Sequence, residues 1–364
     1  MVGTIIPSTA GRRGDPHRGT MQLRPLLDVR NLQTYFVSGT NIVRAVDDVS
    51  FALREGERLG IVGESGSGKS VTALSIMRLI DPPAGRTIGG AVIFEDEDLL
   101  TLTEVEMQAV RGGRIAMVFQ DPMTALNPVF TVGEQLTETI RLHRGVGGRE
   151  ARDIAVHALR DVQIARPERR LDDYPHQFSG GMRQRLVIAM ALSSEPRLLI
   201  ADEPTTALDV TTQAQILDLM FRLTEERGTA VILISHDLGI VAGFCERVQE
   251  MYAGRIIESG RADDIFERPL HPYTAGLIGS VSRLDRPRAH RLHSISGQPP
   301  SLVTLPSGCA FHPRCAHAVE RCRVEAPPLR LMHADHAAAC HFAGELDLVG
   351  ADDARSTAET VIGA

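Results

Sequence analysis

One eight-residue stretch constrains this chain more than any other feature. The apolar run Leu59–Val62 precedes it, and the spacing of an amphipathic helix follows it. Glycines let the backbone curl until successive N–H groups face an anion, and the next helix adds its positive dipole end. The stretch predicts a strand, a phosphate-binding loop and a helix, in which a lysine reaches phosphate and a serine Mg²⁺. Its residues are Gly63, Glu64, Ser65, Gly66, Ser67, Gly68, Lys69 and Ser70.

Length and charge narrow the class of protein. With 364 residues and 43% hydrophobic content, the chain can bury the core of one large domain or of two to three modest ones. No apolar run reaches the roughly 18 to 20 residues of a membrane span. The net charge of −7 argues against generic binding to nucleic acid. Residues 1–24 have no apolar signal core, so we expect a disordered lead, and either Met1 or Met21 can be the start.

The spacing of apolar residues predicts three kinds of structural element along the chain. Alternation at 26–32, 43–46 and 49–53 predicts a small antiparallel β layer before the phosphate loop. Helical spacing at 70–80 predicts a helix after it, and the same spacing from about 131 to 192 predicts an inserted helical subdomain. Apolar runs at 115–119, 197–201 and 230–234 predict buried strands. Together these patterns predict an α/β protein.

Each of those three strands is followed by polar residues. Gln120 follows the first, Asp202 and Glu203 end the second, and His236 follows the third. Ligands bind at the carboxyl ends of strands in α/β sheets. Two carboxylates at the end of a buried strand are costly unless a metal or a reacting water uses them. We expect Asp202 to hold Mg²⁺, Glu203 to polarise an attacking water and His236 to contact the terminal phosphate.

Two further segments are candidates for nucleotide contacts. Ser179 suits a helix N-cap, and Gly180 and Gly181 expose backbone N–H groups to an anion. Tyr35 and Phe36 lie between the first predicted strands, and either ring can stack on a nucleotide base.

Four of the five cysteines lie near the C-terminus. Cys309, Cys315, Cys322 and Cys340 have the spacing C-x5-C-x6-C-x17-C, and without an export signal metal binding is preferred to disulfides. Four thiolates can hold Zn²⁺ or an iron–sulfur cluster, although the spacing differs from that of a zinc ribbon. We expect Cys245 to be a buried small hydrophobe and residues 344–364, acidic and rich in small residues, to be disordered.

The order of these motifs resembles that of the nucleotide-binding subunits of ABC transporters, over residues 25 to about 260. The resemblance implies a P-loop ATPase core with an antiparallel β layer and a helical subdomain at about 121–195. It also implies a head-to-tail dimer in which the phosphate loop of one subunit and residues 179–181 of the other bind the same ATP. The segment Phe178–Arg185 departs from the commonest signature at Phe178 and Met182, and this form is similar to that of the oligopeptide/dipeptide importers.

The resemblance also implies individual roles. ATP and Mg²⁺ are the expected cofactors. The implied roles are adenine stacking for Phe36, Walker A ligands for Lys69 and Ser70, the Q-loop residue that touches Mg²⁺ for Gln120, the Walker B aspartate for Asp202, the catalytic base for Glu203, the D-loop aspartate of Ala207-Leu208-Asp209 for Asp209, and the switch histidine for His236.

The tail resembles the C-terminal extension of peptide and nickel importer ATPases at residues 268–274 and 297–302. We expect a small irregular extension at 261–343 in which the four cysteines hold a [4Fe–4S] cluster, with zinc as the alternative. The implied function is ATP-driven uptake of di- or oligopeptides at the cytoplasmic face of the cell membrane. Nickel or another solute is an alternative cargo, and an ABC ATPase acting on ribosomes or DNA is an alternative of another class.

The implied partners are two transmembrane permeases, a solute-binding protein and a second ATPase subunit, with no nucleic acid among them. Whether that second ATPase subunit is a copy of this chain or a paralogue stays open.

Overall fold

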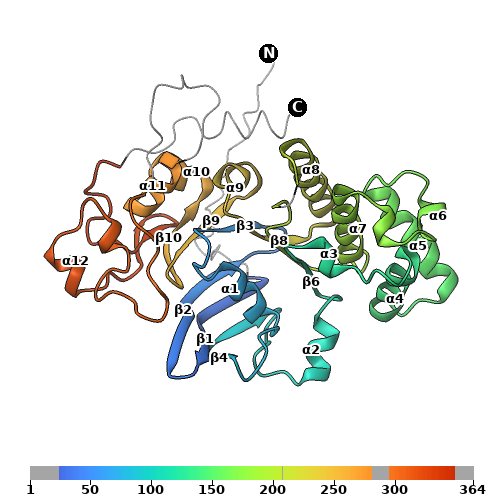
Figure 1. Ribbon diagram of the computed structural model, residues 1–364, viewed down its shortest axis with the longest axis horizontal. Helices are drawn as coiled ribbons and strands as arrows, with labels where there is room; N and C mark the ends of the chain where they lie inside the picture. The colour runs from blue at the N-terminus through green and yellow to red at the C-terminus, as the bar shows by residue number, and fades with distance from the viewer. Residues whose placement is uncertain (1–23, 207, 281–294, 349–364) are drawn as a thin grey trace, which may run out of the picture.

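The computed structural model describes residues 24–206, 208–280 and 295–348. Two β-sheets form its centre, with a helical region on one side and the C-terminal extension on the other (Figure 1). The smaller sheet is antiparallel and has four strands in the order β2-β1-β4-β5. These strands are β1 (Leu27–Ser38), β2 (Asn41–Leu53), β4 (Gly85–Phe94) and β5 (Glu97–Asp98).

The antiparallel layer is present as predicted, but two long strands replace the three short ones expected before the phosphate loop, and β4 and β5 add to the layer after that loop. The segments 43–46 and 49–53 form the single strand β2, which continues through an irregularity at Asp48. Asp48 has φ 66° and Asn31 on β1 has φ 47°, and the side-chain amide of Asn31 donates to Asp48 Oδ1 at 2.7 Å. This irregularity interrupts the period-two alternation, so the sequence pattern splits one strand into two.

The larger sheet has eight strands in the order β11-β12-β10-β9-β3-β8-β7-β6. Strands β9, β3, β8, β7 and β6 run parallel, and β10, β12 and β11 extend the sheet antiparallel. The strands are β3 (Arg58–Val62), β6 (Ile115–Val118), β7 (Leu198–Asp202), β8 (Ala230–Ile234), β9 (Arg247–Tyr252), β10 (Arg255–Arg261), β11 (Arg330–His333) and β12 (His336–Ala338). Every residue of β7 and β8 is buried, which is why both read as continuous apolar runs.

The helical subdomain lies between β6 and β7 in the chain. It contains α3 (Pro122–Ala125), α4 (Val132–Arg144), α5 (Gly148–Asp161), α6 (Pro167–Arg170), η1 (Pro175–Gln177) and α7 (Gly180–Leu192). Helix α4 begins with a capping box in which Thr131 and Glu134 satisfy each other's backbone N–H groups. Its apolar residues at 132, 136 and 140 are buried, so the helical periodicity of this segment has the predicted structural cause.

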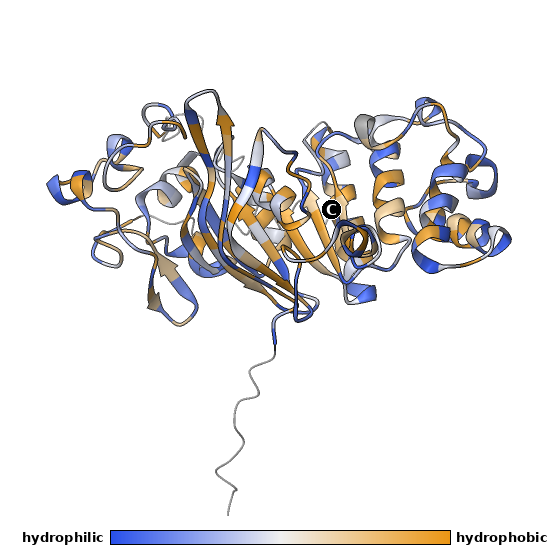
Figure 2. Ribbon diagram, turned by 90° about the horizontal axis from the view of Figure 1, so that it is seen from below, coloured by the Kyte–Doolittle hydropathy of each residue, from blue (hydrophilic) through white to orange (hydrophobic). Residues whose placement is uncertain are grey.

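The remaining helices are α1 (Lys69–Ile76), α2 (Glu104–Val110), α8 (Val210–Arg227), α9 (Leu238–Phe244), α10 (Ala262–Glu267), α11 (Pro272–Ser280), η2 (His312–Arg314) and α12 (Glu320–Val324). Helix α1 was predicted to reach residue 80 but ends at Ile76, because Arg78 adopts the left-handed conformation at φ 51°. Apolar residues line the central strands and the inner faces of the helices, and polar residues lie outside (Figure 2). Among the described residues, no helix combines the length and apolarity that a bilayer crossing requires.

The C-terminal extension is more regular than predicted. Its strands β11 and β12 form a hairpin, and β12 pairs with β10 through Glu258 with Ala338 and Ser259 with Ala337. The predicted irregular segment therefore continues the central sheet, because the edge of β10 offers backbone groups to a partner far away in sequence. Of the predicted disordered tail, residues 344–348 are described and form turns or irregular backbone. The rest of that tail and the predicted lead, with both possible starts, lie outside the described residues.

Candidate nucleotide site

The loop at residues 63–70 connects β3 with α1, and its glycines are required by close backbone contacts. Gly63 has φ 144°, and a Cβ there would lie 2.2 Å from the carbonyl oxygen of Met251. Gly68 has φ 109°, and a Cβ there would lie 2.3 Å from the carbonyl oxygen of Ala45. Only glycine fits both positions, so the backbone of this loop is held between β9 and β2.

Lys69 and Ser70 begin α1 at the centre of the site. Lys69 is 5% exposed, and its Nζ donates to the carbonyl oxygens of Gly63 at 2.8 Å and Glu64 at 3.1 Å. Burial lowers the pKa of this ammonium group, while nearby carboxylates, Glu203 first, oppose the shift. Ser70 Oγ donates to Asp202 Oδ1 at 2.9 Å. This hydrogen bond joins the phosphate loop to the end of β7. The sequence predicts the loop and the strand end from two separate patterns, and the structure shows that they are in contact.

Asp202 is the last residue of β7 and is 6% exposed. Burial raises the pKa of its carboxyl group, the Ser70 hydrogen bond lowers it and neighbouring Glu203 raises it further. A hydroxyl and a carboxylate in contact are the hard oxygen ligands that Mg²⁺ prefers. The donor set therefore fits the predicted magnesium ion.

Glu203 brings the ends of three strands together. Its Oε2 accepts from Gln120 Nε2, beyond β6, at 3.1 Å and lies 3.3 Å from Nδ1 of His236, beyond β8. Thr206 Oγ1 also donates to this oxygen at 2.8 Å. Glu203 has φ 46°, a conformation that is strained for a non-glycine residue and often marks a functional position. Thr206 is a contact that the sequence analysis missed, and its spacing of three residues from Glu203 is the signal that indicates it.

Tyr35 and Phe36 are distinguished by their partners. The hydroxyl of Tyr35 donates to Asp47 Oδ1 at 2.6 Å, and Asp47 also accepts from Arg255. Phe36 is half-buried and packs over Gly85, where an added Cβ would lie 2.6 Å from the Phe36 ring. The Tyr35 side chain therefore belongs to a hydrogen-bonded network with Asp47 and Arg255. The Phe36 ring has no polar group to join such a network, so it is the better candidate for base stacking.

The structure does not bring Ser179, Gly180 and Gly181 into this group. Ser179 caps α7 by accepting from the N–H of Met182 at 3.4 Å, and in the first turn of that helix Gly180 is exposed and Gly181 is half-buried. Asp209 likewise caps α8, accepting from the N–H of Thr212 at 3.0 Å, and this hydrogen bond lowers its pKa. Ala207 in the same motif lies outside the described residues. Both caps therefore bond within their own helices and not to the phosphate loop of their own chain.

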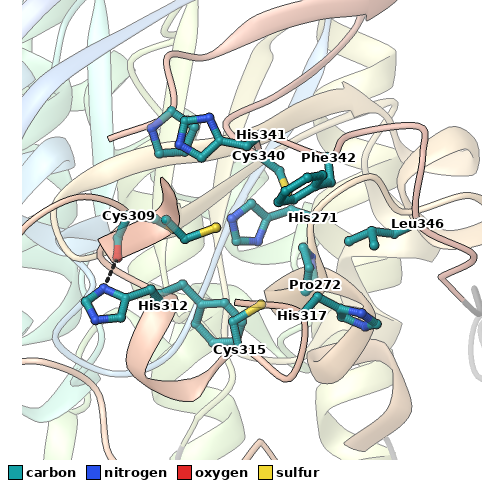
Figure 3. A pocket seen from close by; sticks show the side chains of 13 residues that line it. His271, Pro272, Cys309, His312, Cys315, His317, Cys340, His341, Phe342 and Leu346 are labelled. Carbon is teal, nitrogen blue, oxygen red and sulfur yellow. Dashed lines mark hydrogen bonds between the residues drawn. The ribbon is translucent and has the colours of Figure 1, made fainter. Parts of the chain in front are cut away.

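The four C-terminal cysteines line one pocket (Figure 3). Its wall also contains His271, His317 and His341. Burial raises the pKa of the thiols of Cys309, Cys315 and Cys340. Within the ranges that the structure describes, no three His, Cys, Asp or Glu side chains converge as a ligand group for one metal ion. The sequence spacing thus identifies residues that share a cavity, but the structure does not support a preformed metal site there.

The fifth cysteine, Cys245, is 6% exposed, and burial raises the pKa of its thiol. Its sulfur lies behind Gly60 on β3, where an added Cβ would be 3.2 Å away. As predicted, this cysteine is a small buried side chain.

A contact between the extension and the phosphate loop was not predicted. The N–H of Glu64 donates to the hydroxyl of Tyr273 at 2.8 Å, and Arg314 donates to both carboxylate oxygens of Glu64 at 2.6 and 2.9 Å. In the sequence, the signal that could have indicated Arg314 is its position directly before Cys315.

Comparisons with known proteins agree with this geometry. Residues 46–206 match the family model described as ABC transporter, and residues 257–322 match that of the oligopeptide/dipeptide transporter C-terminal region. A probable peptide ABC transporter ATP-binding protein of Sinorhizobium fredii is 54% identical, covering 88% of this chain and 96% of that protein. The oligopeptide transport ATP-binding protein OppD of Salmonella typhimurium is 52% identical, covering 86% of this chain and 93% of that protein.

Among solved structures, the dimeric ATP-binding cassette MJ0796 bound to ADP and Pi is 31% identical, with a TM-score of 0.58. The match covers 65% of this chain and 98% of that one. The region it leaves out is about a third of this chain, consistent with a nucleotide-binding core that carries an extension. The chain therefore belongs to the ATP-binding subunits of ABC transporters, as an ATPase of the oligopeptide/dipeptide group.

Proposed function

We propose that this chain hydrolyses ATP to drive uptake of di- or oligopeptides through two partner permeases. The observation that carries the ATPase part is the convergence of Gln120, Glu203 and His236 beside the pair of Ser70 and Asp202. The cargo follows from the match at residues 257–322 and from the names of the relatives. A nickel or other solute importer is the alternative within the family.

The site residues have distinct tasks in this proposal. Ser70 and Asp202, with Gln120, would hold Mg²⁺, which neutralises charge on the phosphates when it is bound. Lys69 exchanges the carbonyl oxygens of Gly63 and Glu64 for phosphate oxygens, since an ammonium group binds an anion more strongly than a neutral carbonyl. The other residues of the loop offer backbone N–H groups, and Phe36 offers its ring to adenine.

Glu203 is the base that takes a proton from the attacking water. Gln120, Thr206 and His236 are bonded to or close to one of its oxygens, so they orient the carboxylate. His236 is 58% exposed at its side chain, which leaves it free to contact the terminal phosphate. Gln120 also lies two residues beyond the end of β6 and precedes the helical subdomain, so it can transmit closure of the site to a permease.

Ser179, Gly180, Gly181 and Asp209 complete the site of a second subunit. Their positions at the first turns of α7 and α8, with Ser179 and Asp209 as the caps, support this assignment. The similar MJ0796 cassette is itself a dimer with ADP and Pi bound. ATP binding closes the dimer, and hydrolysis with product release opens it again.

Glu203→Gln tests the ATPase assignment. The amide keeps the shape and the hydrogen bonds of the side chain but cannot accept the proton, so ATP binding is retained and turnover falls by about 10² to 10⁴-fold. Turnover in the assembled transporter and ATP binding by the purified chain are measured together. Hydrolysis near the wild-type rate would refute Glu203 as the base, and Glu225→Gln on the exposed end of α8 is the matched control.

The four cysteines are proposed to hold a [4Fe–4S] cluster. A single zinc ion requires thiolates that converge on one point, whereas each thiolate of a cluster binds a different iron. The proposal is supported by the placement of all four thiols on the wall of one cavity, as a cluster with one thiolate for each iron requires. Iron and acid-labile sulfide are measured on protein purified without oxygen. We expect four of each per chain for a [4Fe–4S] cluster, and zinc without iron would overturn the proposal.

We further propose the boundaries 25–260 for the ATPase domain and 261–343 for the extension. The subunit sits peripherally at the cytoplasmic face of the membrane, in a complex with the permeases, a second ATPase subunit and an extracytoplasmic solute-binding protein. Co-purification with permeases is the expected result, whereas co-purification with ribosomes or DNA would support an ABC ATPase of another class. Transport of peptide against nickel by the whole complex decides the cargo.

A further inference from the structure

The phosphate loop carries a negative charge that the extension neutralises. Glu64 is the second residue of the loop, and its carboxylate accepts two hydrogen bonds from the guanidinium of Arg314, at 2.6 and 2.9 Å. The Arg314 side chain is 5% exposed and that of Glu64 is 25% exposed. A bidentate pair shielded from water in this way is stronger and more specific than a surface ion pair.

Arg314 is held in place from several sides. Its guanidinium lies 5.9 Å from the ring centres of both Tyr252 and Phe311, and it donates to the hydroxyl of Tyr252 at 3.4 Å. Tyr252 in turn packs against Tyr273, whose hydroxyl accepts the N–H of Glu64. The extension therefore contacts both the backbone and the side chain of one loop residue.

A carboxylate beside a polyphosphate site is unfavourable unless it is paired. ATP brings several negative charges to the loop, and a like charge on Glu64 would repel them in a partly buried setting where screening is weak. Arg314 cancels that charge and fixes the direction in which the carboxylate points. Lys69 bonds the carbonyl oxygen of the same residue, so a shift of Glu64 would also disturb the phosphate-binding ammonium group.

We propose that Arg314 is a positioning residue for ATP: by pairing with Glu64 it removes a repulsive charge from the phosphate loop and lets the extension set nucleotide affinity. This inference rests on the proposed function of residues 63–70. Arg314 ends η2, directly before Cys315 on the wall of the cysteine pocket. Two adjacent residues therefore link the cysteine pocket to the phosphate loop: Cys315 lines the pocket, and Arg314 pairs with the charge of Glu64.

The test is a double-mutant cycle on the full-length chain. The affinity for ATP is measured calorimetrically by titrating ATP into the protein in the presence of Mg²⁺. We expect Arg314→Met to weaken ATP binding about tenfold by exposing the Glu64 charge to the phosphates. In a Glu64→Gln background the same replacement weakens ATP binding less than about twofold, since no carboxylate remains to repel. Arg314→Lys keeps the charge and retains most of the affinity. Arg321→Met, at an exposed pair with Glu325 in the same extension, is the control.

The outcomes separate charge from packing. An unchanged affinity in Arg314→Met, or an equal loss in both backgrounds, overturns the proposal, because the arginine would then act through packing or have no role at the site. If Arg314→Met fails to fold, the comparison of Arg314→Lys with wild type and the salt dependence of ATP binding by Glu64→Gln decide in its place. Absence of ATP binding by the wild-type chain itself would refute the proposed function, which is a different result from a failed cycle.

Discussion

At the scale of single residues, Glu250 is the least expected side chain. It lies on β9 opposite Val62 of β3, is fully buried, and neither of its carboxylate oxygens has a hydrogen-bond partner among the described residues. Burial, followed by the charge of Glu258, raises its pKa well above the usual value of 4.5. The folded protein therefore favours the neutral form of Glu250.

This raised pKa makes stability depend on pH. The unfolded chain releases the Glu250 proton near pH 4.5, while the folded chain keeps it, so the free energy of unfolding falls as pH rises above 4.5. Glu250→Gln removes the ionisation and leaves the shape unchanged. We expect its stability relative to wild type to increase between pH 5 and pH 8, by at most about 1.4 kcal/mol per pH unit. Urea unfolding at both pH values measures this, and a difference independent of pH would contradict it.

At the scale of elements, one carboxylate joins three segments. Glu258 of β10 is fully buried and accepts from the N–H groups of Leu270 and His271, before α11, at 2.7 and 2.9 Å. It also lies 2.8 Å from Nε2 of His336 on β12. The hairpin of β11 and β12 pairs with β10 over only a few residues, so this carboxylate is a main attachment of the extension to the sheet.

Loss of this attachment is testable. Glu258→Ala leaves two N–H groups and a histidine buried without their acceptor, and we expect a loss of about 3 to 5 kcal/mol in unfolding free energy. The hairpin should become sensitive to protease before the ATPase core does. Glu320→Ala, at a side chain that is 84% exposed in the same extension, is the control. Equal protease resistance of both variants would show that strand pairing alone holds the hairpin.

At the scale of the whole molecule, the proposed function requires each chain to present two separate halves of a site. In the proposed dimer, residues 63–70 with Asp202 and Glu203 would form one half, and the helix N-termini capped by Ser179 and Asp209 would form the other. Two-fold pairing of identical chains would join opposite halves twice, because a symmetric interface repeats each contact.

Mixing variants tests whether the chain pairs with itself. Lys69→Met inactivates the half of the site that contains the phosphate loop, and Ser179→Asp inactivates the other half. The aspartate still caps the helix, but its charge repels phosphate. Each variant alone should be nearly inactive. A one-to-one mixture should recover about a quarter of the wild-type ATPase rate, since half of the dimers are mixed and each has one intact site. No recovery would indicate that the partner subunit is a different chain.

The local patterns of this sequence are sufficient to predict the central residues of the nucleotide site. The phosphate loop, Gln120, Glu203 and His236 each come after a strand that is recognisable from its own residues, and Asp202 ends one. Carboxyl ends of parallel strands meet at one edge, so adjacency in space follows from adjacency to strands. Periodicity also predicts the antiparallel layer and the helical subdomain, whereas the family is identified from the resemblance of the motif order to a known family.

Only the tertiary structure decided the contacts that join distant segments. Arg314 meets Glu64 across 250 residues, and His336 meets Glu258 across 78. The hairpin β11–β12 finds the edge of β10, and Thr206 completes the hydrogen bonds of Glu203. Periodicity reports how a segment faces its nearest layer, but pairing between remote segments depends on strand order, register and shape, which no local pattern contains. The phosphate loop was determined by the sequence, and its neutralising arginine by the fold.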